Sequence, residues 1–296
     1  MLVAMFIVLI WNACGLGARV KSDFIINEFR NNSVSMVAIM EPKQDSCIIL
    51  EYAQRLKVCG FLHGDPPNSQ IWLFWKDHIT VDLLNTSDQA MTTKISVGTQ
   101  EFFFSFIYTK CNPQEREALW YDLDGLYSND SPWVVGGDFN IVSCPEEKKG
   151  GGDFPKSSSQ AFASLLSRNG LMDIGYKGSV FTWFNNQHGG RCTWCRLDRV
   201  LMNEVTISMF PVSKVTHLVQ HLSDHSPLHL SLGTGVSNED HVMFSKTWLE
   251  EMSFFDMVRE SWDSLHWGNP WICFHNNLRR IKHLLHTWKR NLPASD

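Results

Sequence analysis

The chain has no excess of positive charge. Its 26 lysines and arginines stand against 31 aspartates and glutamates, so the formal net charge at pH 7 is −5. Proteins that coat nucleic acid without specificity are strongly basic, because Lys and Arg neutralise the phosphates. The composition therefore excludes a nucleic-acid-coating protein, and any nucleic-acid binding has to come from a local basic surface.

Long apolar runs are also missing. The apolar stretch near the N-terminus, residues 2–11, is about ten residues long, whereas a membrane-spanning helix requires about 20. No basic segment precedes this stretch, as one would in a signal peptide, although Ala13 and Gly15 supply small residues nearby. Because the run is rich in Ile, Val and Phe, it favours a doubly buried strand over a signal-peptide core. We expect no membrane association.

The eight cysteines are dispersed and form no ligand framework. Cys192 and Cys195 make a single CxxC pair, and a zinc site needs a second pair at comparable spacing, which is lacking. No βαβ pattern of the thioredoxin kind surrounds the pair, so a redox role is not expected either. Dispersed thiols in a chain of this size are typical of reduced cysteines and indicate an intracellular setting.

What the sequence does contain is an alternation of strand and helix patterns. With 44% apolar and 19% charged residues, the composition is that of a soluble globular protein. Apolar periodicity predicts helices over 18–30, 48–58, 113–126 and 159–169. Strand patterns cover 2–11, 34–40, 71–75, 79–84, 94–97, 102–108, 133–135, 180–184, 196–201 and 221–232. The pattern predicts an α/β architecture with two packed sheets.

The C-terminal part has a different composition. Residues 233–241 are predicted to be a linker, and helical periodicity over 242–262 and 271–290 predicts a helical segment, 242–296. The second helix combines an apolar stripe with a basic face. Such a face is more often solvated than bound to nucleic acid.

Polar side chains recur where the predicted strands end. In Gly136-Gly137-Asp138-Phe139-Asn140, two glycines permit a tight turn that presents an Asp and an Asn. Chemistry in α/β sheets gathers at the carboxyl ends of strands. A single strand-end Asx residue is usually structural, but eight polar residues recur in this way: Asn12, Glu41, Tyr108, Asp138, Asn140, Asp198, Asp224 and His225.

A second pattern involves histidine spacing. Four histidines follow one another every fourth residue: His217, His221, His225 and His229. On a helix they would share one face and could bind zinc. Pro227 and the alternating leucines over 228–232 favour a strand instead, so we do not expect a histidine zinc site.

Five short motifs occur in a fixed order along the chain: Trp11-Asn12, Glu41, Gly137-Asp138-Phe139-Asn140, Leu197-Asp198-Arg199 and Ser223-Asp224-His225. This ordered set resembles the endonuclease/exonuclease/phosphatase superfamily over residues 6–232, in particular the endonuclease domains of plant LINE-type retroelement proteins. The tail is similar to the connector that precedes a reverse transcriptase in such proteins. Since no reverse transcriptase follows it in this sequence, we expect a fragment or a domesticated remnant.

The resemblance implies a four-layer α/β sandwich of two mixed sheets flanked by helices, followed by C-terminal helices. It also implies hydrolysis of phosphodiesters with Mg²⁺ or Mn²⁺, most simply the nicking of target DNA. Phosphoryl transfer requires neutralised oxygen charge, a positioned water and donors to the phosphate oxygens. The implied catalytic residues are Asn12, Tyr108, Asp138, Asn140, Asp198 and His225, with Glu41 and Asp224 at the metal and Lys110, Arg116, Phe181 and Trp183 at the substrate.

The resemblance gives these residues distinct roles. Asp138 would orient or deprotonate the attacking water, and Asn12 and Asn140 would hold the water and the phosphate. Asp198 would fix the orientation of His225. Tyr108 would donate to the phosphate or the leaving oxygen.

Two positions depart from the family pattern, and several alternatives stay open. Cys14 stands where the family tends to place Arg or an acidic residue, and Thr109-Lys110 replaces a small residue. Phe181 and Trp183 could equally be core residues, and Arg116 a solvated helix charge. A phosphatase or small-molecule phosphodiesterase of the same fold is the rival enzyme, and a catalytically inactive remnant is the third possibility. We expect DNA as the partner, no obligate protein partner, and a nuclear or cytoplasmic location.

Overall fold

The computed structural model describes residues 5–31, 34–64, 70–124, 126, 130–220, 222–234, 248–249, 251–262, and 277, 278, 280, 281, 284, 285 and 288. The chain divides into two compact units, Met1–Val236 and Ser237–Asp296. Among the described helices, none is long and apolar enough to cross a membrane.

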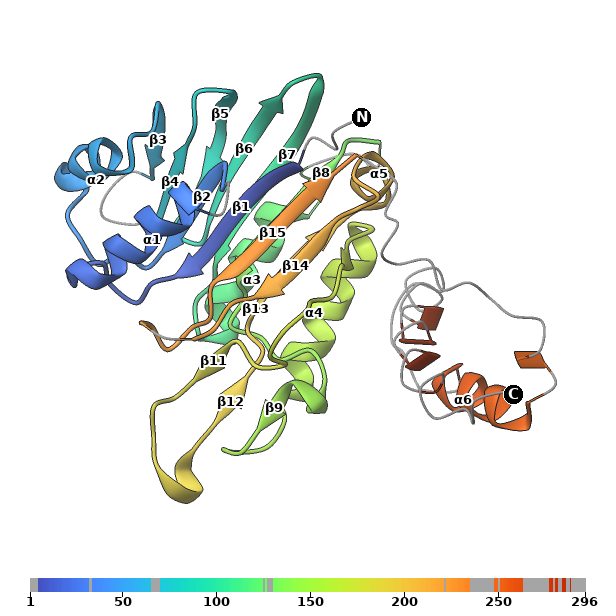
Figure 1. Cartoon of the computed structure of the whole chain (residues 1–296). Helices are drawn as coiled ribbons and strands as arrows, with labels where there is room; N and C mark the ends of the chain where they lie inside the picture. The colour runs from blue at the N-terminus through green and yellow to red at the C-terminus, as the bar shows by residue number, and fades with distance from the viewer. Residues whose placement is uncertain are drawn as a thin grey trace. The chain divides into compact units, whose positions relative to one another are not determined.

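Two six-stranded sheets form the first unit (Figure 1). The first sheet has the order β14 (Lys214–His217), β15 (Leu228–Gly233), β1 (Met5–Asn12), β2 (Met36–Met40), β4 (Ile71–Trp75) and β3 (Gly60–His63). The second has the order β10 (Met172–Asp173), β13 (Asp198–Met202), β8 (Trp133–Asp138), β7 (Gln100–Tyr108), β6 (Ala90–Val97) and β5 (Ile79–Thr86). Each sheet is mixed, because β1–β2 and β7–β8 are parallel and the other neighbours are antiparallel.

Alternation along each strand divides the core into three layers of packing. Ile10 on β1 and Phe104 on β7 lie in the cluster between the two sheets. Leu9 and Trp11, the sequence neighbours of Ile10, pack outward against the helices that cover the first sheet. Val135 on β8 packs outward on the other side. Because successive strand residues point to opposite faces, one continuous apolar run can serve two core layers.

The helices cover the outer faces. The helical elements of this unit are α1 (Arg19–Asn31), η1 (Ser46–Ile48), α2 (Ile49–Leu56), α3 (Pro113–Leu123), η2 (Pro145–Glu147), α4 (Lys156–Arg168), η3 (Gly189–Arg191) and α5 (Glu204–Met209). Side chains of α1 and α2 pack on the first sheet, and those of α3 and α4 pack on the second. The predicted four-layer α/β sandwich of two mixed sheets is therefore confirmed.

Helix α3 illustrates how local sequence sets a boundary. Asn112 accepts a hydrogen bond from the backbone N–H of Gln114, and Pro113 occupies the first helical position. Proline is tolerated there because that N–H has no partner within the helix. The apolar stripe, including Leu119 and Leu123, then faces the sheet.

A small third sheet joins β11 (Trp183–Phe184), β12 (Trp194–Cys195) and β9 (Lys148–Lys149). Here the sequence-based prediction of a strand over 180–184 was too long, since only its last two residues pair. The hydroxyl of Thr182 accepts hydrogen bonds from the backbone N–H groups of Leu197 and Asp198. Thr182 is also bound through its backbone, because its N–H donates to the Cys195 carbonyl at 3.0 Å and its carbonyl accepts from the Ser226 N–H at 2.7 Å.

The second unit contains α6 (Met252–Trp262), whose residue Phe254 clusters with Trp248 and Leu285. The helix predicted over 242–262 begins at residue 252 in the described part. Residues 235–241 of the predicted linker, and most of the helix predicted over 271–290, lie outside the described residues.

Candidate active site

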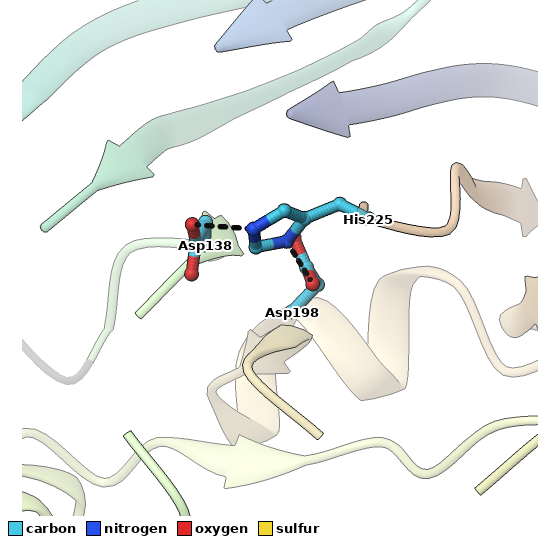
Figure 2. Close-up of side chains that lie close together, drawn as sticks. All are labelled: Asp138, Asp198 and His225. Atoms are coloured by element: carbon cyan, nitrogen blue, oxygen red, sulfur yellow. Dashed lines mark hydrogen bonds and ion pairs between the residues drawn. The ribbon is translucent and has the colours of Figure 1, made fainter. Parts of the chain in front are cut away.

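An imidazole between two carboxylates forms the centre of the site (Figure 2). Nδ1 of His225 lies 2.9 Å from Oδ2 of Asp198, and Nε2 lies 3.7 Å from Oδ2 of Asp138. The exposed fractions of Asp138, Asp198 and His225 are 1%, 3% and 5%. Three titratable groups are thus held together away from bulk water.

Strand register brings the two carboxylates together. In the antiparallel pair β8–β13, Asp138 is directly opposite Asp198. His225 comes from the loop before β15 and forms a β-bridge with Trp183. Residues about 60 and 90 positions apart in sequence therefore meet at one sheet edge.

Gly137 is required for this geometry. Its φ is +145°, and an added Cβ would lie 2.0 Å from the carbonyl oxygen of Ile107. Any side chain here would push β8 away from β7. Gly137, which directly precedes Asp138, is therefore required for the packing of the strand that carries the carboxylate.

Amide groups fix the Asp138 carboxylate from two sides. Asn12 Nδ2 donates to Asp138 Oδ2 at 3.0 Å, and the Asn140 backbone N–H donates to Asp138 Oδ1 at 2.9 Å. Asn140 has a left-handed φ of +47°, and its side chain donates to the Thr109 carbonyl at 2.7 Å. Both asparagines expected at the site therefore orient the carboxylate.

The electrostatics of the centre favour a charged imidazole. Burial alone lowers the pKa of His225, but the charges of Asp198 and Asp138 outweigh it and raise that pKa to about 10. Burial also raises the pKa of Asp138, the His225 charge lowers it, and the net change is upward. The arrangement favours His225 as an imidazolium, which hydrogen-bonds Asp198 through Nδ1 and forms an ion pair with Asp138 through Nε2.

Tyr108 and Glu41 lie beside this centre. Tyr108 is opposite Asp138 in the parallel β7–β8 pair. Burial, followed by the charge of Glu41 and a hydrogen bond to it, raises the pKa of Tyr108 far above its usual value. The phenol therefore stays protonated and can act only as a hydrogen-bond donor when an oxyanion is present.

Glu41 is placed by a strained loop after β2. Its φ is +54°, and the φ of Lys43 is +50°. Lys43 Nζ lies 3.0 Å from Glu41 Oε1 and 3.3 Å from Cys14 Sγ. Cys14, the departure from the family pattern, thus borders the Glu41 carboxylate.

Asp224, next to His225 in the sequence, is bound by Trp183. Trp183 Nε1 donates to Asp224 Oδ2 at 3.1 Å, and its ring packs against Val142 and Leu197. Trp183, expected at the DNA surface, thus also fixes an acidic residue of the site.

The other expected substrate contacts have different positions. Lys110 pairs with Asp88 at 3.2 Å and remains partly exposed. Phe181 is half-buried. Arg116 is only 4% exposed, and its guanidinium donates to the Asn140 carbonyl and to Ser158 Oγ. Both sequence-based interpretations of Arg116, as a phosphate contact and as a solvated charge, are therefore wrong, because the side chain is buried and bound internally.

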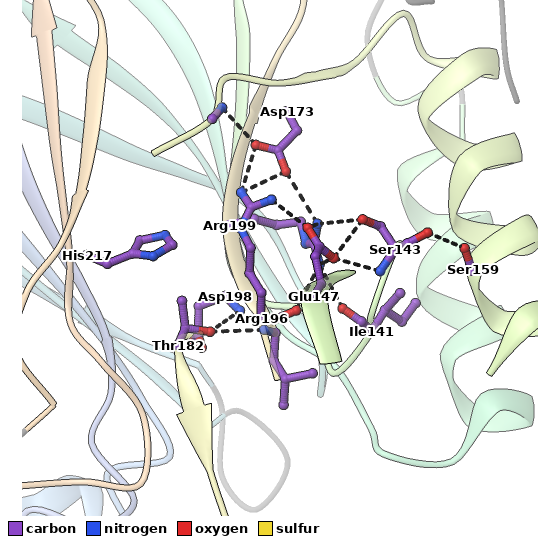
Figure 3. A network of polar contacts seen from close by, with 12 residues as sticks. Ile141, Ser143, Glu147, Ser159, Asp173, Thr182, Arg196, Asp198, Arg199 and His217 are labelled. Atoms are coloured by element: carbon purple, nitrogen blue, oxygen red, sulfur yellow. Dashed lines mark hydrogen bonds and ion pairs between the residues drawn. The ribbon is translucent and has the colours of Figure 1, made fainter. Parts of the chain in front are cut away.

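A buried charge cluster next to the site was not anticipated (Figure 3). Arg196 and Arg199 pair with Glu147 and Asp173 at distances of 2.7 to 3.3 Å. We call these four residues the arginine cluster. Its signal in the sequence was the occurrence of Arg196 and Arg199 close to Asp198, but their acidic partners lie in η2 and β10.

The comparisons with known proteins agree with this geometry. A family model described as Endonuclease/Exonuclease/phosphatase family matches residues 9–225, which is more than half of the chain. The chain belongs to this family, whose members are phosphoester hydrolases and are generally dependent on divalent metals. A search of the curated proteins returned no match.

Solved structures share the fold at low sequence identity. The endonuclease domain of TRAS1, a telomere-specific non-LTR retrotransposon, has a TM-score of 0.60 and 14% identity, covering 78% of this chain and 99% of that one. The AP endonuclease LMAP from Leishmania major has a TM-score of 0.57 and 15% identity, covering 78% and 88%. The 3′ phosphatase NExo from Neisseria, bound to a product DNA hairpin, has a TM-score of 0.56 and 16% identity, covering 77% and 99%.

The donor set suits a hard divalent cation. The carboxylates of Asp138 and Asp198 offer oxygens that lie within 4.8 Å of each other and of the His225 ring, whereas the His225 imidazolium itself has no free lone pair for a cation. Glu41, 21% exposed, adds a carboxylate that pairs with the Lys43 ammonium at 3.0 Å. Carboxylate oxygens are the ligands that Mg²⁺ and Mn²⁺ prefer. The residues present therefore fit the group that the family implies.

Proposed function

We propose that the chain is a metal-dependent DNA endonuclease that nicks its target, derived from a LINE-type retroelement of the plant kind. The observation that carries the proposal is the buried Asp198–His225–Asp138 centre, with Asn12 and Asn140 fixed on the same carboxylate. The TRAS1 endonuclease domain shares the fold over nearly its whole length. For the domains we propose 6–232 as the nuclease, 233–241 as the linker and 242–296 as the connector.

Each residue has a physical role in this proposal. Asp138 accepts the proton of the attacking water, since its carboxylate is oriented by two amide donors. Asp198 holds Nδ1 of His225 and thereby directs Nε2, as an imidazolium donor, to a phosphate oxygen. Tyr108, kept protonated by its neighbours, donates a hydrogen bond to the phosphate or the leaving oxygen.

Glu41 would hold Mg²⁺ or Mn²⁺, with Asp224 supporting that side of the site. When bound, the cation supplies charge neutralisation at the phosphate and leaving oxygens. Lys110 and Phe181 remain proposed DNA contacts, because both are partly exposed. A nuclear location follows if genomic DNA is the target.

A plasmid-nicking assay with Mg²⁺ tests the proposal. Wild type should convert supercoiled to open-circular DNA, EDTA should abolish the reaction, and Asp138→Ala and His225→Ala should each lower the rate by about 10²- to 10⁴-fold. Asp77→Ala and His78→Ala are matched controls, because both residues are exposed in the turn before β5. Nicking that survives both site substitutions would rule out the proposed residues.

A phosphatase is the second candidate, supported by the net charge of −5 and by the fold shared with a 3′ phosphatase. Release of inorganic phosphate from a 3′-phosphorylated oligonucleotide, without plasmid nicking, would favour it. If wild type performs neither reaction in Mg²⁺ or Mn²⁺, the chain is an inactive remnant.

A further inference from the structure

The turn after β8 is bound from two sides by buried arginines. Arg116, on α3, donates to the carbonyl of Asn140. Arg199, on β13, donates to the next carbonyl, that of Ile141, at 2.8 Å. Two consecutive carbonyls are thus bound by guanidinium groups from two different elements.

The rest of the loop is anchored to the same cluster. The backbone N–H and the hydroxyl of Ser143 donate to Glu147 Oε2 at 2.8 and 2.7 Å. Glu147 in turn pairs with Arg199 at 2.9 Å. Arg116 reaches the turn from outside the arginine cluster, and its other guanidinium nitrogen binds Ser158 on α4 at 3.2 Å.

The bound turn has a conformation that needs support. Asn140 is a non-glycine residue with a φ of +47°, a left-handed conformation that Asn tolerates better than other non-glycine residues but that is stabilised by bonds from its surroundings. This conformation directs the Asn140 N–H to Asp138 Oδ1. A relaxed turn would release that donor and leave Asn12, on Oδ2, as the remaining amide that orients the Asp138 carboxylate.

We infer that Arg116 is a positioning residue, which holds the Asn140 turn and thereby sets the orientation of Asp138. The inference rests on the proposed function for its kinetic consequence, but not for its structural one. Arg116 is not proposed to contact the substrate. It acts through the Asn140 carbonyl.

The test compares Arg116→Met, which removes the donors, with Arg116→Lys, which keeps one. Arg168→Met is the matched control, because Arg168 pairs with Asp124 on the surface. Thermal unfolding is recorded for each variant, and all measurements are made well below the midpoint. Amide hydrogen exchange at Asn140 reports the turn directly, whether or not the protein is active.

In Arg116→Met, exchange at Asn140 should become at least about tenfold faster, while the amides of β8 keep wild-type rates. The kcat for nicking should fall by about 10- to 100-fold with KM nearly unchanged, because a small misplacement affects the chemical step. Arg116→Lys should recover part of both losses, and Arg168→Met should match wild type.

Wild-type exchange and kcat in a folded Arg116→Met variant would overturn the inference. So would an Arg116→Lys variant no better than Arg116→Met, since the hydrogen-bond donor would then not matter. If wild type itself does not nick DNA, the proposed function fails, and the exchange measurement still decides whether Arg116 holds the turn.

Discussion

Two buried groups of charges share strand β13, which carries Asp198 and Arg199, and they differ in charge balance. The centre around Asp138 has two carboxylates and one imidazole, whereas the arginine cluster has two carboxylates and two guanidinium groups. Asp198 and Arg199 are sequence neighbours, but successive strand residues face opposite sides. One strand therefore contributes to both groups.

The imbalance appears in the pKa values. Burial alone would raise the pKa of Glu147, but Arg199 and Arg196 outweigh it and hold that pKa well below its usual range. The same two arginines outweigh burial at Asp173. At Asp138 the net shift is upward. Buried acids alone thus do not mark an active site, whereas acids with too few cationic partners do, because they can accept a cation or a proton.

The largest expected effect on stability comes from removing one guanidinium group from the arginine cluster. Arg199→Met leaves Glu147 and Asp173 with one guanidinium between them, which should lower the free energy of unfolding by about 3–5 kcal/mol. Urea unfolding monitored by circular dichroism measures it, with Arg168→Met as the exposed control. The double variant Arg199→Met with Glu147→Gln should recover part of the lost free energy of unfolding. A cost below about 1 kcal/mol would show that the cluster is not the buried unit described here.

Removing the Asp198 carboxylate, which orients His225 in the centre around Asp138, should affect activity more than stability. In Asp198→Asn the amide can no longer stabilise the imidazolium, so nicking should slow by about 10- to 100-fold. His225 should also titrate at lower pH, because the charge of Asp198 helps to raise its pKa. NMR of the imidazole would follow this titration. An unchanged titration would disprove the electrostatic role of Asp198.

The stability that the arginine cluster contributes should depend on pH. Since the pKa of Asp173 is lowered on folding, its stabilising effect is present above its ordinary value of 3.8 and is lost as the pH falls. Asp173→Asn should therefore cost about 2 kcal/mol at pH 7, and less as the pH falls below about 4. Unfolding curves at several pH values, with Asp77→Asn as control, measure this. A difference independent of pH would contradict the lowered pKa.

The smallest expected effect concerns the hydrogen bond between Trp183 and Asp224, beside the centre around Asp138. Trp183→Phe keeps the ring packing but removes the hydrogen bond to Asp224, which should cost about 1 kcal/mol. If Asp224 supports the metal side, the Mg²⁺ concentration for half-maximal nicking should rise a few-fold. Trp194→Phe is the matched control, since Trp194 lies on the adjacent β12. Equal effects of both substitutions would exclude a specific role of the Trp183 indole.

Much of the fold was accessible from the sequence because apolar periodicity reports local structure. The helix predicted over 18–30 matches α1 (Arg19–Asn31), and the apolar run near the N-terminus contains β1. The strand predicted over 180–184 was too long, because the observed β11 covers only Trp183–Phe184. The histidine spacing is another case: His217 lies at the end of β14 and His229 in β15, while His221 lies outside the described residues. Two of the four positions therefore lie on strands and do not share a helix face.

The sequence by itself determined which residues stand at strand ends, since turn chemistry and periodicity are properties of short segments. Only the tertiary structure decided which charges are neutralised, because that depends on strand register and on distant loops. Arg116 shows the difference. Its place near the start of α3 was readable from the sequence, whereas its bond to the Asn140 carbonyl exists only once α3 packs beside the turn after β8.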